Sequence, residues 1–96
     1  MTAQGFLDSG ADMSVIPNAA VRDLNLQPVS VARSRGFGGS VEESMIFAAS
    51  LSLVREEVEA ARVPGWDEDY ALVGRDLING WRLVLDGPAQ SFSLSR

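Results

Sequence analysis

The chain has 96 residues and a net charge of -5, so it can form one small domain, of a size that buries about 60–70% of its unfolded surface. It contains no cysteine, histidine or lysine, which excludes disulfides, thiolate nucleophiles, Ser-His-Asp sites, Schiff bases and the P-loop lysine, and leaves carboxylate chemistry for an enzyme. The acidic balance argues against nucleic-acid binding, and the lack of a signal peptide or of a run of about 18 apolar residues predicts a soluble, cytoplasmic chain with no membrane partner.

The first part of the chain predicts a strand, a turn and a second strand. Residues 4–7 are a short extended piece, and Asp8-Ser9-Gly10 follows with residue types that favour a turn. Residues 13–16 are apolar and include branched side chains, which predicts another strand. A proline and an asparagine then precede a short helix, expected at residues 19–24.

Alternation of apolar and polar residues in the middle of the chain predicts a long hairpin. One strand is expected over residues 29–35 and a second over residues 41–53. The cluster Gly36-Phe37-Gly38-Gly39 lies between them and is typical of a hairpin tip. Alternate residues of the second strand are expected to share one face: Met45, Phe47, Ala49, Leu51 and Leu53.

The second half of the chain is expected to add strands and one more helix. Residues 56–63 suit either a helix or an edge strand, and we favour the strand. The remaining predicted elements are a polar loop at residues 64–69, a buried strand at 70–73 ended by Gly74, a short helix at 75–79 capped by Gly80, and a closing hairpin of residues 81–85 and 91–94.

Asp8 is the candidate catalytic residue. It lies between the apolar pair Phe6-Leu7 and Gly10, so its carboxylate is expected to be partly desolvated. Two carboxylates held about 3 Å apart cannot both ionise, so they share a proton, and one acts as acid while the other activates water. The chain has no second motif of this kind, so catalysis requires a symmetric homodimer with Asp8 on the two-fold axis.

Each of these features also has an ordinary explanation. Asp-Ser-Gly is a common turn with an Asx-type bond, and the pattern Asp-[Ser/Thr]-Gly occurs by chance about once in a few thousand positions. A glycine cluster alone is more often a plain hairpin turn, and this one lacks the sequel of a phosphate-binding loop. Trp66 and Trp81 are expected to be packing residues, and Asp67-Glu68-Asp69 a solvated loop without calcium-binding spacing.

Four segments occur in an order and spacing that are found together in one protein family. They are Leu7-Asp8-Ser9-Gly10-Ala11-Asp12 with Ser14-Val15-Ile16, then Gly36-Phe37-Gly38-Gly39, Leu72-Val73-Gly74-Arg75-Asp76-Leu77 and Leu83-Val84-Leu85-Asp86-Gly87-Pro88. Over nearly the whole chain they resemble the retropepsin family, the single-domain aspartic proteases of retroviruses and their cellular and bacterial relatives. The resemblance implies a mostly β, single-domain acid protease fold with a glycine-rich flap hairpin and one or two short helices.

The resemblance also implies roles for single residues. Asp8 would be the catalytic carboxylate, and Asp12 would bind the substrate main chain and pair with Arg75. The residues that would support the active site are Ser9, which interlocks with its symmetry mate, Gly10, which admits substrate backbone, Ala11, Val73 and Gly74. The residues that would close over a bound peptide as a mobile flap are Gly36, Phe37, Gly38 and Gly39.

The function implied is that of an aspartic endopeptidase formed by residues 1–96, with no cofactor or metal, whose partners are a second copy and a peptide or protein substrate. Only seven residues precede Asp8, so the domain is expected to lack one or two strands that precede this motif in the family. Their lack would leave apolar surface and unpaired backbone near the catalytic loop. Two alternatives stay open: a non-catalytic dimerisation or peptide-binding module with the same fold, and a structural β domain with an incidental turn.

Overall fold

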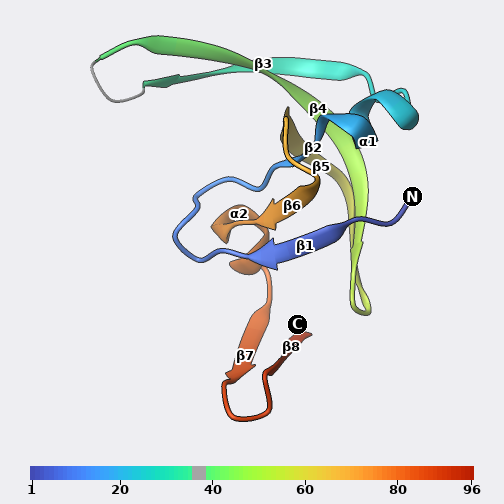
Figure 1. Cartoon of the computed structure of the whole chain (residues 1–96), viewed down its shortest axis with the longest axis vertical. Coiled ribbons are helices and arrows are strands. Elements are labelled where there is room, and N and C mark those ends of the chain that lie inside the picture. Colours follow the sequence, from blue (N-terminus) through green and yellow to red (C-terminus); the bar gives the residue numbers. More distant parts are fainter. Residues whose placement is uncertain (36–38) are drawn as a thin grey trace.

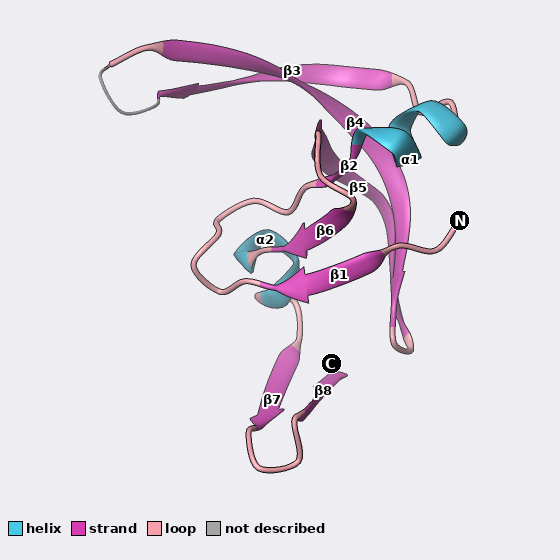
Figure 2. Ribbon diagram, in the orientation of Figure 1, coloured by secondary structure: helices cyan, strands magenta, loops and turns pink. Residues whose placement is uncertain are grey.

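The structure is a computed structural model that describes residues 1–35 and 39–96 (Figure 1). Strands dominate it and two short helices accompany them (Figure 2). Neither of these described helices is long and apolar enough to cross a membrane. In chain order the elements are β1 (Gln4–Leu7), β2 (Ile16–Pro17), α1 (Asn18–Asp23), β3 (Pro28–Arg35), β4 (Val41–Leu53), β5 (Glu56–Trp66), β6 (Tyr70–Val73), α2 (Arg75–Ile78), β7 (Arg82–Asp86) and β8 (Ser91–Ser95).

Strand β6 holds the two ends of the loop that carries Asp8. β1 lies parallel to β6, with Leu7 opposite Val73. Leu72 of β6 forms an antiparallel bridge with Val15. The backbone N–H and C=O of Leu72 both bond to Val15, so this bridge lies on the side of β6 opposite to β1. The chain between β1 and β2 therefore leaves along one side of β6 and returns along the other.

The larger sheet holds the core of the chain. Its strand order is β2-β5-β4-β3, with β2 parallel to β5 and the other two pairs antiparallel. The buried cluster consists of Ile16, Ala49, Ala61 and Val63, and Val63 is completely buried. The half-buried residues that pack against this cluster are Val21, Leu26, Leu51, Val58 and Leu77. β4 and β5 supply most of this core, so their long antiparallel pairing is the central element of the fold.

Strand β3 and the first half of β4 project from the body as a two-stranded arm (Figure 1). The face predicted for β4 is correct in the body, where Phe47, Ala49, Leu51 and Leu53 are buried or half-buried. It is wrong on the arm, where Met45 is 59% exposed. The reason is that β4 pairs with β5 only over its second half, so within the described residues nothing covers the arm.

Most predicted elements are confirmed, and the strand favoured over a helix at residues 56–63 is part of β5. Two of the predicted elements have wrong bounds. The strand expected at residues 13–16 begins only at Ile16, because the backbone N–H of Ser14 donates to the Asp76 side chain instead of to a neighbouring strand. The loop expected at residues 64–69 is partly strand, because Gly65 and Trp66 pair in parallel with β2.

Smaller shifts occur at the helices. α1 begins at Asn18, one residue earlier than predicted, with Pro17 as its N-cap. α2 ends at Ile78 with Asn79 as its C-cap, so Gly80 follows the cap instead of forming it. The predicted buried strand β6 is buried only at Val73, and its other residues are half-buried. The closing hairpin is confirmed as β7 and β8.

An apolar hollow lies between the second half of β4 and the strands β1 and β6, next to an open edge of β4. Beyond Phe47, the edge of β4 that faces away from β5 has no strand partner in the described part of the chain. The hollow next to it has a volume of about 340 Å³ and is lined mainly by apolar side chains, with Leu51 and Leu53 from β4 and Leu72 from β6. Ser14 and Val73 also line it, so the hollow reaches the end of the Asp8 loop at Ser14. The expected lack of one or two strands before Asp8 stays a prediction.

Candidate active site

The turn that carries Asp8 is closed by backbone hydrogen bonds and by the side chain of Asp8 itself. The backbone N–H of Asp8 donates to the Val73 carbonyl at 2.9 Å, and that of Ala11 donates to the Asp8 carbonyl at 3.1 Å. Asp8 as a residue is half-buried, and its Oδ1 accepts an exposed hydrogen bond from the Gly10 N–H at 2.9 Å. Oδ2 accepts no hydrogen bond from the described residues, so this oxygen is available to a substrate, a water molecule or a second carboxylate.

Glycine is required at position 74 because two chain segments pass very close to it. A Cβ on Gly74 would lie 2.9 Å from the Ala11 carbonyl oxygen and 2.9 Å from the Met13 carbonyl carbon, which no ordinary side chain tolerates. The next residue, Arg75, donates its backbone N–H to the same Ala11 oxygen at 2.8 Å. The start of α2 therefore lies directly against the loop that carries Asp8.

A buried serine fixes the far side of the same loop. Ser14 is only 1% exposed, and its Oγ accepts a hydrogen bond from the Gly74 N–H at 2.8 Å. The Ser14 hydroxyl donates to Oδ1 of Asp76 at 2.7 Å, and the Ser14 N–H donates to the same oxygen at 3.0 Å. Both ends of the loop are therefore fastened: at Asp8 by β6, and at Ser14 by the first turn of α2.

Sequence reasoning missed this role of Ser14 and Asp76. Both residues lie within motifs that carry the family resemblance, but no role followed from them there. The sequence did contain a signal for this role. A short helix was predicted to begin directly after Gly74, and Asp76 lies in its first turn, where a carboxylate can accept hydrogen bonds from free N–H groups. Only the fold shows that one of its donors is Ser14, which lies 62 residues earlier in the chain.

The aromatic residues around β1 and β6 have packing roles. Phe6 meets Tyr70 edge to face with ring centroids 5.1 Å apart, and Tyr70 meets Trp66 in the same manner at 5.1 Å. The Trp66 indole N–H donates to the Tyr70 carbonyl at 2.7 Å. Trp66 therefore packs against the strand beside the Asp8 turn, as expected from the sequence.

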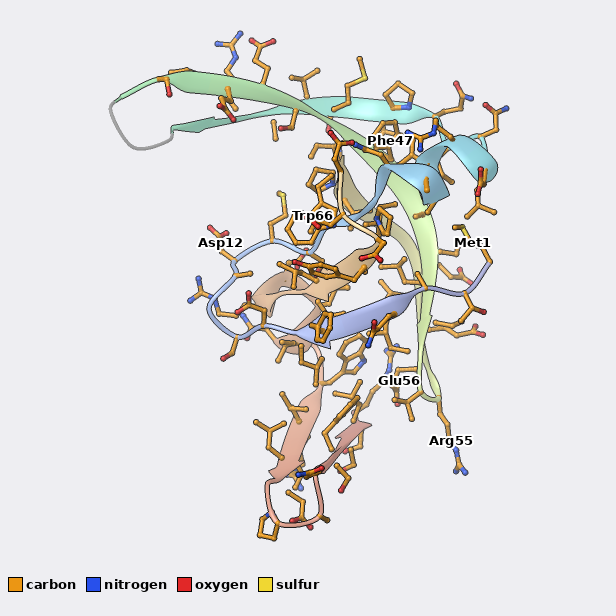
Figure 3. All side chains as sticks on the ribbon, in the orientation of Figure 1. Met1, Asp12, Phe47, Arg55, Glu56 and Trp66 are labelled. Atoms are coloured by element: carbon orange, nitrogen blue, oxygen red, sulfur yellow. The ribbon has the colours of Figure 1, made fainter. Side chains whose placement is uncertain are left out.

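The ion pair predicted between Asp12 and Arg75 is not formed in this single chain. Asp12 lies on the outer curve of the loop between β1 and β2 (Figure 3), and both residues are exposed. The salt bridges among the described residues are Arg33–Glu43 at 3.1 Å and Arg96–Glu56 at 2.8 Å. An exposed pair gains little from association in water, so nothing in the monomer holds these two side chains together.

Of the predicted flap tip, Gly36, Phe37 and Gly38 lie outside the described residues. Gly39 has a φ of 80°, a left-handed conformation that favours glycine, and a Cβ there would meet nothing within 4 Å. Below the tip, β3 and β4 stay paired up to Val41 opposite Arg35. In the view of Figure 1 this arm and the loop after β1 extend to the same side of the molecule.

The acidic loop after β5 shows no metal-binding geometry. Asp67 accepts a hydrogen bond from the Asn18 side chain at 2.7 Å, which ties this loop to α1. Among residues 1–35 and 39–96, no three acidic, histidine or cysteine side chains lie close enough to hold an ion.

Comparison with known proteins supports the fold, through one similar solved structure. No protein-family model and no curated protein matches the chain. A solved structure that is similar is the foamy viral protease–reverse transcriptase in complex with double-stranded DNA, with a TM-score of 0.62 at 22% sequence identity. The match covers 81% of this chain and 13% of that chain, so our chain corresponds to a small part of the viral protein. At this identity the likeness establishes the fold, which agrees with the mostly β class expected from the sequence.

Proposed function

We propose that the chain is an aspartic endopeptidase that acts as a homodimer, with one Asp8 from each copy. The observation that carries the proposal is the turn at the half-buried residue Asp8. Its carboxylate has one oxygen that accepts no hydrogen bond from the described residues, and the turn is held by Val73 and Gly74 on a fold similar to part of a viral protease–reverse transcriptase. One chain supplies one such carboxylate, so the second must come from a second copy.

The chemistry follows from a pair of carboxylates that shares one proton. The ionised Asp8 takes a proton from a water molecule, whose oxygen attacks the carbonyl carbon of the peptide bond, while the protonated Asp8 gives its proton to the carbonyl oxygen. The tetrahedral intermediate then collapses: one of its hydroxyl groups gives a proton to the ionised carboxylate, the C–N bond breaks, and the leaving nitrogen takes up a proton from the protonated carboxylate, so the pair again shares one proton. Gly10 and Asp12 lie beside Asp8 on the same exposed loop, where they would contact the substrate main chain.

Replacing Asp8 by asparagine tests the proposal. We expect Asp8→Asn to lower peptide cleavage at mildly acidic pH by about 1,000-fold or more, because an amide neither takes a proton from water nor shares one. The fold should persist, since the side-chain oxygen of asparagine still accepts the Gly10 N–H. Cleavage products of a diverse peptide mixture, identified by mass spectrometry, report the activity, and Glu68→Gln on the exposed loop after β5 is the charge-matched control. Undiminished cleavage by Asp8→Asn would reject the assignment.

Mixing the two forms tests whether one site needs two chains. If wild type is equilibrated with a ninefold excess of Asp8→Asn, random pairing leaves about one wild-type chain in ten with a wild-type partner, so the activity per wild-type chain should fall about tenfold. Unchanged activity per wild-type chain would show that each chain acts alone.

A non-catalytic dimerisation or peptide-binding module is the second candidate. It is favoured by the bond from the Gly10 N–H to Asp8, which also belongs to an ordinary turn. Under this alternative, wild type and Asp8→Asn bind peptides equally and neither cleaves them. Isothermal titration with peptides from the same mixture, together with the cleavage assay, separates the two candidates.

A further inference from the structure

The peptide group between Val73 and Gly74 bonds to both ends of the Asp8 loop. Its carbonyl oxygen accepts the Asp8 N–H at 2.9 Å, and its N–H donates to Oγ of Ser14 at 2.8 Å. A peptide group is planar and trans, so its C=O and N–H point in opposite directions and turn together as one rigid unit. The orientation of this single group therefore fixes the oxygen that holds the backbone of Asp8.

That orientation depends on the hydroxyl group of Ser14. Ser14 is only 1% exposed, so solvent does not supply a second acceptor for the Gly74 N–H. A hydroxyl group has one hydrogen to donate, and the hydrogen of Ser14 goes to Oδ1 of Asp76 at 2.7 Å. With its hydrogen directed to Asp76, the Ser14 oxygen presents a lone pair to the Gly74 N–H. The carboxylate of Asp76 therefore decides how the hydroxyl group is turned.

Asp76 is itself held in place by α2. It lies in the first turn of this helix, where the Leu77 N–H also donates to Oδ1 at 2.9 Å. A carboxylate accepts and does not donate, so it suits an oxygen that is surrounded by donors. Among the described residues, the Asp76 side chain bonds to Ser14 and Leu77 and to no atom of Asp8. Any effect of Asp76 on Asp8 therefore passes through the groups between them.

We propose that Asp76 is a positioning residue of the active site: through the Ser14 hydroxyl and the Val73–Gly74 peptide group it sets where the backbone of Asp8 lies, and thereby the rate of cleavage. The effect on cleavage rests on the proposed function, whereas the effect on the loop does not. The rate of a reaction depends steeply on the placement of the reacting groups, and a shift of about 1 Å can lower it about 100-fold. Binding of a peptide is spread over many contacts, so the effect should fall on kcat and not on KM.

Two substitutions of similar size separate the hydrogen bonds of Asp76 from its bulk. Asp76→Asn keeps an oxygen that accepts the bonds from Ser14, whereas Asp76→Leu fills the same space without an acceptor. With a peptide that the wild type cleaves, we expect Asp76→Leu to lower kcat about 10- to 100-fold with KM within about threefold of wild type. Asp76→Asn should keep kcat within about threefold. A loss confined to KM, an unchanged kcat for Asp76→Leu, or equal losses for both variants would overturn the proposal.

The matched control removes a bonded carboxylate from a different loop. Asp67 accepts a hydrogen bond from the Asn18 side chain at 2.7 Å, in the loop after β5. Asp67→Ala therefore deletes the same charge and one side-chain bond, and it should leave kcat and KM within about threefold of wild type. Circular dichroism at the assay temperature checks that every variant is folded. A loss of kcat in Asp67→Ala as large as that in Asp76→Leu would show that the position of the carboxylate is irrelevant, which rejects the proposal.

A double variant tests whether Asp76 acts through Ser14. If it does, Ser14→Ala lowers kcat by a similar factor, and Asp76→Leu added to Ser14→Ala lowers it by no more than about threefold further. Two independent effects multiply. Losses that multiply in the double variant would therefore reject the path through Ser14.

Amide hydrogen exchange, measured by NMR, reports on the loop without any activity. The Asp8 and Gly74 N–H groups bond to and from the peptide group of the proposed path. Their exchange should be at least about tenfold faster in Asp76→Leu and unchanged in Asp76→Asn and Asp67→Ala. Val63, which is completely buried in the core, is the reference and should exchange at the wild-type rate in all three variants. Equal acceleration at Val63 would show a general loss of stability, which contradicts a displaced loop.

The outcomes separate this inference from the proposed function. If the wild type cleaves no peptide, the peptidase is rejected, and the exchange rates decide whether Asp76 holds the Asp8 loop. If the wild type cleaves peptides and Asp76→Leu cleaves them equally well, the peptidase stands and the positioning role is rejected.

Discussion

At the scale of single residues, one oxygen of the Asp76 carboxylate binds several of the groups that hold the Asp8 loop in place. Oδ1 of Asp76 accepts three hydrogen bonds: from the hydroxyl and the backbone N–H of Ser14, and from the Leu77 N–H at 2.9 Å. The Ser14 hydroxyl in turn accepts the Gly74 N–H, so it is both donor and acceptor in a buried position. Hydrogen bonds to a charged acceptor are stronger than neutral ones, and a buried group that loses its partner bears the full desolvation cost.

We therefore expect Ser14→Ala to lower the free energy of unfolding by about 1–3 kcal/mol, because the buried Gly74 N–H loses its acceptor. Ser52→Ala, at an exposed position on β4, removes an identical hydroxyl and should change stability by less than about 0.5 kcal/mol. Urea unfolding followed by tryptophan fluorescence measures both. Equal midpoints for the two variants would show that the Ser14 bonds contribute no net stability.

At the scale of elements, the junction between β6 and α2 places the Asp8 loop. The chain must turn from strand to helix within one residue while the backbone of Ala11 and Met13 passes beside it. Gly74 has a φ of -93°, which any residue adopts, so its requirement for glycine comes from close approach and not from backbone conformation. The absence of a side chain therefore sets how near α2 comes to the loop.

A methyl group at this junction should separate the two segments. We expect Gly74→Ala to destabilise the chain by about 1–3 kcal/mol, because backbone atoms, unlike a flexible side chain, cannot move aside locally. Gly87→Ala in the turn between β7 and β8 is the matched control, since a Cβ there meets nothing within 4 Å. Chemical denaturation compares the two, and a wild-type midpoint for Gly74→Ala would contradict the close approach seen in the structure.

At the scale of the whole molecule, the described strands form three separate sheets, and the buried cluster lies in the four-stranded one. The β7–β8 hairpin lies apart from the four-stranded sheet, and large apolar side chains such as Leu85 and Phe92 stay exposed. A chain of this size buries a smaller fraction of its unfolded surface than a larger domain does, so association of the proposed dimer would add to its stability. We infer that the stability of the folded chain is coupled to dimerisation.

This coupling predicts a melting temperature that depends on protein concentration. Each tenfold increase in concentration should stabilise the dimer by about 1.4 kcal/mol, which raises the melting temperature by several degrees. Differential scanning calorimetry from micromolar to millimolar concentration measures the shift. A wild-type melting temperature that is the same at all concentrations would show that unfolding is independent of association.

Local patterns account for the elements that sequence reasoning predicted correctly. Alternation along β4 and the turn residues of the closing hairpin depend on neighbours in the chain, and the strand at 41–53 was predicted with its observed bounds. The errors occur where distant groups compete. Ser14 bonds to Asp76 and leaves the predicted strand, and Gly65 extends β5 by pairing with β2.

The sequence by itself determined which chemistry is available: one carboxylate motif at Asp8, without histidine, cysteine or lysine, in a chain whose periodicity is that of strands. The tertiary structure decided what holds that motif, because the Val73 carbonyl, the space beside Gly74 and the Asp76 carboxylate reach it only when β6 and α2 pack against the loop. It also decided which apolar residues remain uncovered. Alternation marks a face as apolar, but only the arrangement of the strands determines whether the chain covers that face itself.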